Sequence, residues 1–290
     1  MAEKLEAIIL DWAGTTMDHG CYAPAVVFQQ VFEAAGVPIS IEEARAPMGA
    51  HKKVHIRKIT QLPEVQKRWR DTHGREPCEE DVEKMFEQFV PAQMACLADY
   101  ADLIPGTLDA IKEFRNMGLK IGSTTGYTGD MMKILLAEAQ KRGYTPDVSV
   151  CSTGHYAVRN KDTYDYGHIR GIGADWNISR PLPHMCNLNA ALLGVSKPYL
   201  CVKVGDTIPD IEEGRNAGMW TIGLAITGNE MGLREEEIRN LPPDEYERRK
   251  QNAYYRMYYA GADVIVDGIE KVPRALTKIM DMALESGAWP

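Results

Sequence analysis

Short apolar runs recur along the chain, and each ends in polar or turn-forming residues. Such runs cover residues 7–10, 119–123, 199–205, 220–226 and 262–266. Between them lie amphipathic stretches with helical spacing, for example PGTLDAIKEFRNMG and GDMMKILLAEAQKRG. Runs of this length suit buried strands, and their alternation with helices is typical of a parallel sheet covered on both faces. The pattern therefore predicts an α/β fold with a Rossmann-like, doubly wound core.

The stretch from about residue 23 to residue 100 interrupts this alternation, because its pattern is helical throughout. Ser40 and Glu43 have the spacing of a capping box, which marks the start of a helix. We expect a small α-helical cap domain inserted just after the first strand. The expected boundaries are 21–102 for the cap, and 1–20 with 103–290 for the core.

Composition narrows the possible functions. The 290 residues carry a formal net charge of -8, and the pI is near 5.5, which argues against a nucleic-acid-binding surface. The six cysteines are scattered without a C-x-x-C pair, so neither a zinc site nor a disulfide framework is indicated. The first strand follows directly on a short polar start, with no leader or membrane segment. We expect a soluble, cytoplasmic protein with free thiols and no membrane partner.

Polar residues follow several of the expected strands, at the edge where open α/β sheets bind ligands. Asp11 follows the first run and Thr125 the second, while Asp206 follows the third with Asp210 four residues later. Arg180 lies in the segment SRPLP. A nucleophile, a hydroxyl, a cation and two more carboxylates can bind a phosphoryl group beside a hard metal ion, so we expect Mg²⁺. Taken singly, each motif also fits a simple turn or helix cap.

The order of these motifs resembles that of the haloacid dehalogenase superfamily of phosphotransferases. The matching positions are Asp11, Thr125, Arg180 and the pair Asp206 and Asp210, and they span nearly the whole core. In the phosphatases of that superfamily the first aspartate is the nucleophile, and an acidic residue two positions later is the general acid and base. Ala13 occupies that position here and can donate no proton. The resemblance to the phosphatases therefore fails at a critical residue.

A narrower resemblance is to the phosphonoacetaldehyde hydrolase, or phosphonatase, family, which splits a carbon–phosphorus bond. The segments that carry it are DWAGTTMDHGCYAP, EEARAPMGAHKKVHIRK, KIGSTTGYTGDMM, SRPLPHMC and KVGDTIPDIEEGRNAGMWTIG. The positions peculiar to that branch are Ala13, Cys21, Met48, Gly49, Lys52, His55 and Tyr127. The match includes both the missing acid and an added amine, which makes it more specific than the superfamily motifs.

This resemblance implies a role for each residue. Asp11 would be the nucleophile, and Lys52 would form a Schiff base with the aldehyde, so that carbon departs as an enamine without an acid. His55 would shuttle protons. The implied substrate-binding residues are Thr125, Gly126, Tyr127, Arg180, Cys21, Met48 and Gly49, although Cys21 and Met48 fit simple core packing equally well. The implied Mg²⁺ ligands are Asp11, the Ala13 carbonyl and Asp206, with Asp210 on the metal's waters.

The residues around Lys52 bear on its reactivity. In PMGAHKKVHIRK, Lys52 and His55 are three residues apart and share one helix face. The basic neighbours would disfavour the charged amine and lower the pKa of Lys52, and only a neutral amine attacks a carbonyl. On the alternative interpretation, the segment is merely a basic, solvated helix.

Two segments fall outside these motifs. Residues 152–179 replace a short connection of the family with a polar, glycine-broken stretch, which we interpret as a tolerated surface loop. Because this stretch leads into Arg180, it could instead lie over the site or extend a subunit contact. The charged run at 244–259 predicts a solvated helix with one aromatic face that packs on the core.

The expected function is that of a Mg²⁺-dependent hydrolase of a small phosphonate, with the homodimer that is typical of the family. Three alternatives stay open. They are an ordinary phosphomonoesterase or phosphomutase of the same superfamily, a related phosphonate hydrolase with altered substrate, and a non-catalytic sensor of phosphate-bearing ligands. Loss of Lys52 separates the first alternative from the expected function, because only the expected function requires the amine.

Overall fold

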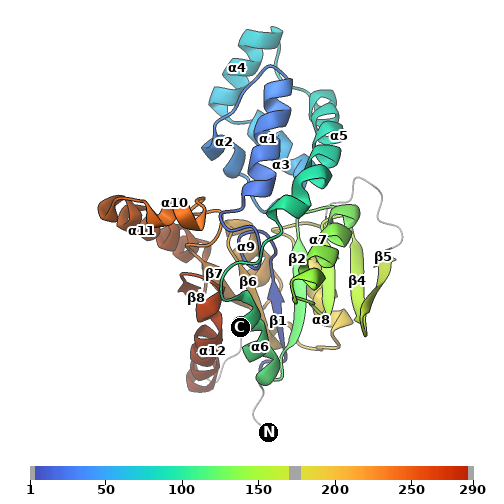
Figure 1. The fold of residues 1–290 in the computed structure, drawn as a ribbon, viewed down its shortest axis with the longest axis vertical. Helices are drawn as coiled ribbons and strands as arrows, with labels where there is room; N and C mark the ends of the chain where they lie inside the picture. The colour runs from blue at the N-terminus through green and yellow to red at the C-terminus, as the bar shows by residue number, and fades with distance from the viewer. Residues whose placement is uncertain (1–3, 170–177, 287–290) are drawn as a thin grey trace.

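The computed structural model describes residues 4–169 and 178–286, and its centre is an eight-stranded sheet (Figure 1). The strand order is β5-β4-β3-β2-β1-β6-β7-β8. The strands are β1 (Ala7–Leu10), β2 (Lys120–Thr125), β3 (Val148–Cys151), β4 (His155–Asn160), β5 (Thr163–His168), β6 (Cys201–Gly205), β7 (Trp220–Leu224) and β8 (Val264–Val266). From β3 to β8 all neighbours pair in parallel. The predicted α/β core with a parallel sheet is confirmed.

Helices cover both faces of the sheet. One face carries α6 (Thr107–Asn116), α7 (Gly129–Lys141) and α12 (Val272–Ser286), and the other carries α8 (His184–Leu192), α9 (Ile208–Asn216) and α11 (Pro243–Ala260). Along β1, Ile8 and Leu10 pack in the cluster that contains α6, α7 and α12, whereas Ala7 and Ile9 pack with α8. Successive strand residues thus serve opposite layers, which is why β1 is apolar throughout. The core is doubly wound as predicted.

Five helices between β1 and α6 form a separate group above the carboxyl ends of the strands (Figure 1). They are α1 (Tyr22–Ala34), α2 (Ile41–Arg45), α3 (Lys52–Thr60), α4 (Pro63–His73) and α5 (Glu79–Cys96). The capping box of Ser40 and Glu43 is present at the start of α2. Phe28 of α1 stacks on Phe89 of α5 with ring centroids 4.5 Å apart, so the helices enclose their own apolar centre. An inserted helical cap is what the sequence predicts.

The two connections between cap and core run side by side. Asp18 donates its backbone N–H to the carbonyl of Asp102, and Ile104 donates to the carbonyl of Thr16, at 3.1 and 3.0 Å. Residues 97–100 form a short 3₁₀ turn, η1 (Leu97–Tyr100), before the second connection. These paired connections lie close to the expected domain boundaries at residues 21 and 102.

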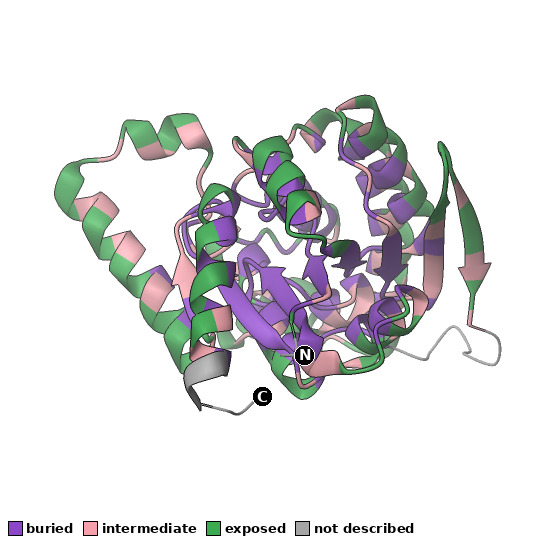
Figure 2. Cartoon of the chain, turned by 90° about the horizontal axis from the view of Figure 1, so that it is seen from below, coloured by how far each residue is buried: buried purple, intermediate pink, exposed green. Residues whose placement is uncertain are grey.

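The expected surface loop over 152–179 is wrong for its first part. Residues 155–168 form the antiparallel hairpin of β4 and β5, which extends the sheet beyond β3. β5 carries polar residues and two tyrosines and is largely exposed at the edge of the sheet (Figure 2). Tyr164 anchors the hairpin by donating its hydroxyl to the carbonyl of Pro146 at 2.9 Å. Residues 170–177 lie outside the described part of the chain.

The aromatic face expected on α11 does not pack as a whole. Tyr255, Tyr258 and Tyr259 are 61%, 68% and 77% exposed. The buried contact of this helix is made by Ala253 and Met257, four residues apart, and the exposed tyrosines lie outside that stripe. The remaining elements of the described residues are the short α10 (Glu235–Arg239) before α11, the 3₁₀ turn η2 (Pro198–Leu200) before β6, and the 3₁₀ turn η3 (Ile269–Lys271) before α12.

None of the helices in residues 4–169 and 178–286 combines the length and the apolarity that crossing a bilayer requires.

Candidate active site

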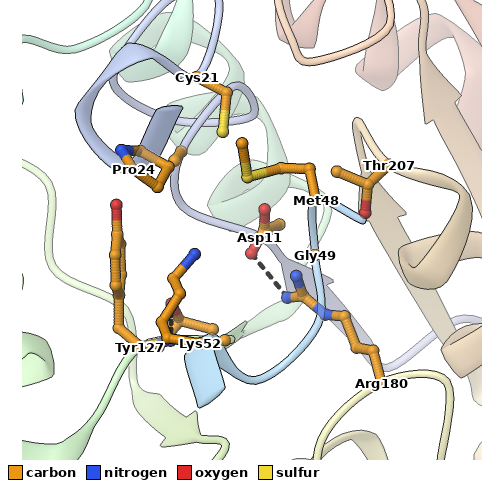
Figure 3. A pocket seen from close by; sticks show the side chains of 12 residues that line it. Asp11, Cys21, Pro24, Met48, Gly49, Lys52, Tyr127, Arg180 and Thr207 are labelled. Carbon is orange, nitrogen blue, oxygen red and sulfur yellow. Dashed lines mark hydrogen bonds and ion pairs between the residues drawn. The ribbon is translucent and has the colours of Figure 1, made fainter. Parts of the chain in front are cut away.

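A small pocket lies where the cap meets the carboxyl ends of the strands (Figure 3). Core residues contribute Asp11, Ala13, Thr125, Gly126, Tyr127, Arg180 and Thr207, and the segment from Cys21 onward contributes Cys21, Pro24, Met48, Gly49 and Lys52. All the predicted site residues except His55, Asp206 and Asp210 are in this lining. The sequence motifs therefore converge, although Asp11 and Arg180, for example, are 169 positions apart.

Asp11 and Arg180 are joined at the core side of the pocket (Figure 3). Arg180 Nη2 lies 2.6 Å from Asp11 Oδ1 and 2.8 Å from the hydroxyl of Thr124. Burial favours the neutral form of Arg180, but the surrounding carboxylates outweigh burial and hold the pKa of Arg180 well above its ordinary range. Arg180 is thus a permanent cation beside the candidate nucleophile, where a phosphoryl oxygen could bind.

Two buried charged residues that the sequence analysis missed complete this network. Glu213 of α9 accepts hydrogen bonds from Arg180 Nε at 3.0 Å and from the Thr124 hydroxyl at 3.3 Å. Lys203 of β6 donates to Asp210 Oδ1 at 2.6 Å. A signal was present: Lys203 stands inside the apolar run YLCVKVG, and Glu213 follows Asp210 by three residues on the same helix. A lysine in a buried strand needs a carboxylate partner.

Three aspartates gather at the end of β1 and β6. One carboxylate oxygen from each of Asp11, Asp206 and Asp210 lies within 4.8 Å of the others. Asp206 accepts a hydrogen bond from the backbone N–H of Asn229 at 2.7 Å. Burial, and then the negative charges of Asp11 and Asp210, raise the pKa of Asp206 well above its ordinary value. The cluster is short of positive charge.

This shortage fits a divalent cation. The buried carboxylates of Asp11, Asp206, Asp210 and Glu213 face only the buried cations Arg180 and Lys203 within the network. In the described ranges no lysine or arginine forms an ion pair with Asp206. Hard oxygen ligands with excess negative charge suit Mg²⁺. Both oxygens of Asp210 already accept hydrogen bonds, from Lys203 and Thr207, so Asp210 suits contact with the metal's waters better than direct ligation.

Lys52 begins α3 and projects its amine into the pocket (Figure 3). Its side chain is buried, and Nζ lies 4.7 Å from the ring centroid of Tyr127 and 5.7 Å from that of Phe28. Burial lowers the pKa of Lys52 from 10.5 to about 8, although Cys21 and Asp11 oppose this shift. The predicted direction is confirmed, but the predicted cause is wrong. Burial dominates, and the contributing cation is Arg180 of the core rather than the basic neighbours on α3.

His55 lies behind Lys52 and does not line the pocket. Its ring stacks on Phe28 at 3.8 Å between centroids, and Nε2 lies 2.8 Å from the carbonyl oxygen of Ala44. Burial and the charge of Lys52 lower the pKa of His55 well below its ordinary value, so the ring is neutral and Nε2 donates to Ala44. Nδ1 has no hydrogen-bond partner among the described residues. The proton-transfer role of His55 stays a prediction, and it would have to use Nδ1.

The loop after β2 provides the candidate anion-binding groups. Thr125 Oγ1 accepts a hydrogen bond from the backbone N–H of Tyr127 at 3.2 Å. The hydroxyl of Ser152 donates to the carbonyls of Gly126 and Tyr127, at 3.0 and 2.9 Å, and so fixes the loop just before α7. A Cβ on Gly126 would lie 2.9 Å from the carbonyl oxygen of Ala50, so only glycine lets this loop approach the cap. Backbone amides at the start of a helix favour anions, and this loop leads into α7.

Cys21 and Met48 form an apolar wall of the pocket. Both are buried, at 3% exposure, and they pack together with Ala25 of α1. Burial raises the pKa of the Cys21 thiol well above its ordinary value, so it is a thiol and not a thiolate. Gly49 lies beside the core, because a Cβ there would come within 2.5 Å of the Thr207 hydroxyl. These residues shape the pocket and do not supply charge.

Comparison with known proteins agrees with this geometry. Residues 5–218 match the family model described as haloacid dehalogenase-like hydrolase. A phosphonoacetaldehyde hydrolase from Syntrophobacter fumaroxidans is 43% identical over 286 residues, covering 99% of this chain and 95% of that protein. The chain belongs to the phosphonoacetaldehyde hydrolase family within the haloacid dehalogenase-like hydrolases. A member from Bacillus cereus is 40% identical, over 95% of this chain and 97% of that one.

A solved structure is also similar to this hydrolase over its whole length. The phosphonoacetaldehyde hydrolase-like protein from Oleispira antarctica superposes with a TM-score of 0.88 at 35% identity. The match covers 100% of this chain and 97% of that chain, so the arrangement of cap and core is shared. The similarity therefore includes both the cap and the core, which together form the pocket.

The pocket of this hydrolase is narrow as it stands. Its volume of about 20 Å³ is enough for roughly one water molecule. A small organic phosphonate has more non-hydrogen atoms than one water molecule, so the pocket would have to widen to hold it. We call the observed arrangement, in which the cap contacts the core at this pocket, the docked cap.

Proposed function

We propose that the enzyme hydrolyses phosphonoacetaldehyde to acetaldehyde and phosphate. The observation that carries the proposal is the buried amine of Lys52, whose pKa is lowered to about 8, in the same pocket as Asp11. The names of the relatives and the absence of an acid at Ala13 support the same reaction. The proposed steps use residues that line or adjoin the pocket.

The first step is condensation of Lys52 with the aldehyde. The neutral amine attacks the carbonyl carbon, one proton is taken up as the carbonyl oxygen leaves as water, and a protonated imine results. A pKa near 8 leaves a useful neutral fraction at neutral pH, whereas an ordinary lysine is almost entirely charged there. The protonated imine would be a cation, and the faces of the Tyr127 and Phe28 rings near Nζ can stabilise it by cation–π interaction.

The second step transfers phosphorus to Asp11. A carboxylate oxygen of Asp11 attacks phosphorus as the carbon–phosphorus bond breaks, and the electron pair of that bond moves onto the imine to give a neutral enamine. The leaving carbon therefore needs no proton at this moment, which is why Ala13 can stand where phosphatases have an acid. Arg180, with Thr125 and the loop amides, would bind the phosphonate oxygens.

Two hydrolyses complete the cycle. The enamine takes a proton on carbon and returns to an imine, which a water molecule cleaves to acetaldehyde and free Lys52. A second water splits the aspartyl phosphate to phosphate and free Asp11. Because the first step releases one water, the cycle consumes one water in all. His55 Nδ1 is a candidate for moving protons near Lys52 during imine formation and cleavage.

We propose Mg²⁺ as the cofactor. Asp11, Asp206 and the Ala13 carbonyl would hold it, with Asp210 binding its waters. When bound, the metal neutralises the repulsion between the Asp11 carboxylate and an anionic substrate. Two further expectations from the family, a homodimer and a cytoplasmic location, stay predictions.

The test is product analysis with phosphonoacetaldehyde, with and without Mg²⁺ and borohydride. The wild-type enzyme should release acetaldehyde and phosphate in equal amounts, and borohydride should trap a reduced adduct on Lys52. Lys52→Arg should lower turnover by roughly 10⁴-fold, since a guanidinium cannot form the imine. Lys53→Arg is the matched control, because Lys53 is the adjacent residue and pairs with Glu79 and Glu83 of α5.

A different outcome would select an alternative. Rapid hydrolysis of several phosphate esters that persists in Lys52→Arg would favour a phosphomonoesterase. Tight binding of phosphate-bearing ligands without any product would favour a sensor. Undiminished carbon–phosphorus cleavage in Lys52→Arg would contradict the imine mechanism.

A further inference from the structure

Arg45 ends α2 in the cap, and its guanidinium lies in the joint between cap and core. The residue is buried, with 7% of its surface exposed. Nη1 donates to the carbonyl of Gly20 at 2.5 Å and lies 3.4 Å from that of Cys21. Its Cζ is 4.9 Å from the ring centroid of Tyr22, which holds the guanidinium from one side. A cap residue is thus anchored to the segment through which the chain enters the cap.

Burial of the Arg45 guanidinium is expected to lower the stability of the fold. No carboxylate in the described ranges forms an ion pair with Arg45, although Asp18 and Glu237 interact with its charge at longer range. Its Nε and Nη2 have no hydrogen-bond partner there. A buried cation with unsatisfied donors destabilises a fold relative to an apolar side chain of similar length. A residue that breaks this rule indicates a role beyond packing.

Asn229 connects Arg45 to the aspartate cluster. The side-chain oxygen of Asn229 lies 3.5 Å from Arg45 Nη1, at the outer limit of a hydrogen bond, and its backbone N–H donates to Asp206 Oδ2 at 2.7 Å. The preceding Gly228 packs directly on Asp206, since a Cβ there would lie 2.1 Å from the Cβ of Asp206. One residue therefore contacts both the cap arginine and the carboxylate.

The same loop also holds the connection to the cap. We call residues 227–233 the Asp206 loop. Within it, Thr227 accepts a hydrogen bond from the N–H of Gly20 at 2.8 Å and donates its hydroxyl to the carbonyl of Gly14 at 2.9 Å. His19 Nδ1 lies 3.0 Å from the carbonyl of Leu233. Arg45 contacts both Gly20 of this connection and Asn229 of the Asp206 loop.

We infer that Arg45 is a positioning residue that ties docking of the cap to the placement of Asp206 through Asn229. Docking of α2 brings the guanidinium to Asn229 and Gly20, and this contact fixes the Asp206 loop in the conformation that supports the carboxylate. The inference rests on the proposed function for its Mg²⁺ site and for the reaction in which Asp206 would take part. Because such coupling is reciprocal, Mg²⁺ should stabilise the docked cap, and the docked cap should strengthen Mg²⁺ binding.

The test compares Arg45→Met with Arg68→Met. Arg68 is the control because it is also a cap arginine, on α4, and it also contacts α2, but it pairs with Glu43 rather than with Gly20 or Asn229. Mg²⁺ affinity is measured by calorimetry, and amide hydrogen exchange of segments 41–48 and 225–233 is measured with and without Mg²⁺. In the wild type, Mg²⁺ should slow exchange in both segments. Arg45→Met should lose this response and bind Mg²⁺ about threefold to tenfold more weakly.

Further variants separate positioning from structure. Asn229→Ala removes the side-chain contact and should reproduce the loss, while Arg45→Lys should restore part of it by reaching the Gly20 carbonyl. A lower melting temperature of Arg45→Met with unchanged Mg²⁺ affinity and unchanged exchange response would overturn the inference, as would the same losses in Arg68→Met. Failure of the proposed function looks different: the wild type would bind Mg²⁺ and show the exchange response yet release no acetaldehyde.

Discussion

The core half and the cap half of the pocket place their charges in opposite ways. On the core side, Asp11 and Glu213 each form an ion pair with the buried Arg180. On the cap side, the single amine of Lys52 lies among aromatic rings, without an ion pair to any described residue. A network of paired charges keeps groups ionised, and an apolar setting keeps an amine close to neutral. One pocket can therefore hold a carboxylate nucleophile and an amine nucleophile together.

Adding an acid beside the nucleophile should have a larger effect than weakening the core network. Ala13→Asp would place a carboxylate near Lys52, raise the pKa of the amine and so deplete its neutral form. We expect carbon–phosphorus cleavage to fall by about 100-fold, while hydrolysis of an alkyl ester such as ethyl phosphate increases because the new acid can protonate the leaving alkoxide. Acetaldehyde released from phosphonoacetaldehyde and phosphate released from ethyl phosphate measure the two effects. Ala13→Asn, which has similar size but no acid, should gain no esterase activity; equal gains in both variants would refute the argument.

Weakening the core network should have a smaller effect. Glu213→Gln keeps the volume of the side chain but removes the charge that holds Arg180 Nε. We expect kcat/KM to fall by about tenfold, mainly through a higher KM and weaker inhibition by inorganic phosphate, because Arg180 would be less well oriented. Steady-state kinetics on phosphonoacetaldehyde and phosphate inhibition check this. Glu212→Gln changes the exposed neighbour on the same helix and should behave like the wild type.

Removing the cap amine should stabilise the fold slightly. The folded pKa of Lys52 is about 8 against an ordinary 10.5, so the folded state disfavours the proton that the unfolded chain carries. The penalty is fully present below about pH 8, shrinks as pH rises towards 10.5, and is absent above it. At pH 7 we expect Lys52→Met to raise the free energy of unfolding by on the order of 1 kcal/mol.

Urea unfolding across this pH range measures that difference. The advantage of Lys52→Met over the wild type should decline between pH 8 and pH 10.5. A constant advantage at every pH would mean that apolar packing, and not the charge, is responsible. Lys53→Met, at a partly exposed position paired with glutamates, should show no such trend.

The sequence predicts those features that depend on local pattern or on the ends of strands. Apolar runs locate β1, β2, β6, β7 and β8, and strand-end motifs bring Asp11, Thr125 and Asp206 to one edge, because the carboxyl ends of parallel strands meet there. The helical period of the inserted segment reveals the cap. These inferences need only spacing along the chain.

Other features depend on contacts between distant elements. The partners Lys203 and Glu213 become visible only when α9 packs on β6, and the lowered pKa of Lys52 results from burial against the core rather than from its neighbours in sequence. The hairpin of β4 and β5 escapes a search for apolar strands, because it forms an exposed edge whose residues are polar or aromatic. Tertiary packing overrides local pattern at each of these places.

The small volume of the pocket implies that the cap moves during each catalytic cycle. In the proposed reaction, phosphonoacetaldehyde would enter while the cap is lifted from the core, and acetaldehyde and phosphate would leave by the same route. Between these moments the docked cap would shelter the reactive enamine and acyl phosphate from bulk solvent. Each turnover would then require the cap to open and close about its two connections to the core, and this motion could limit the rate even where the chemical steps are fast.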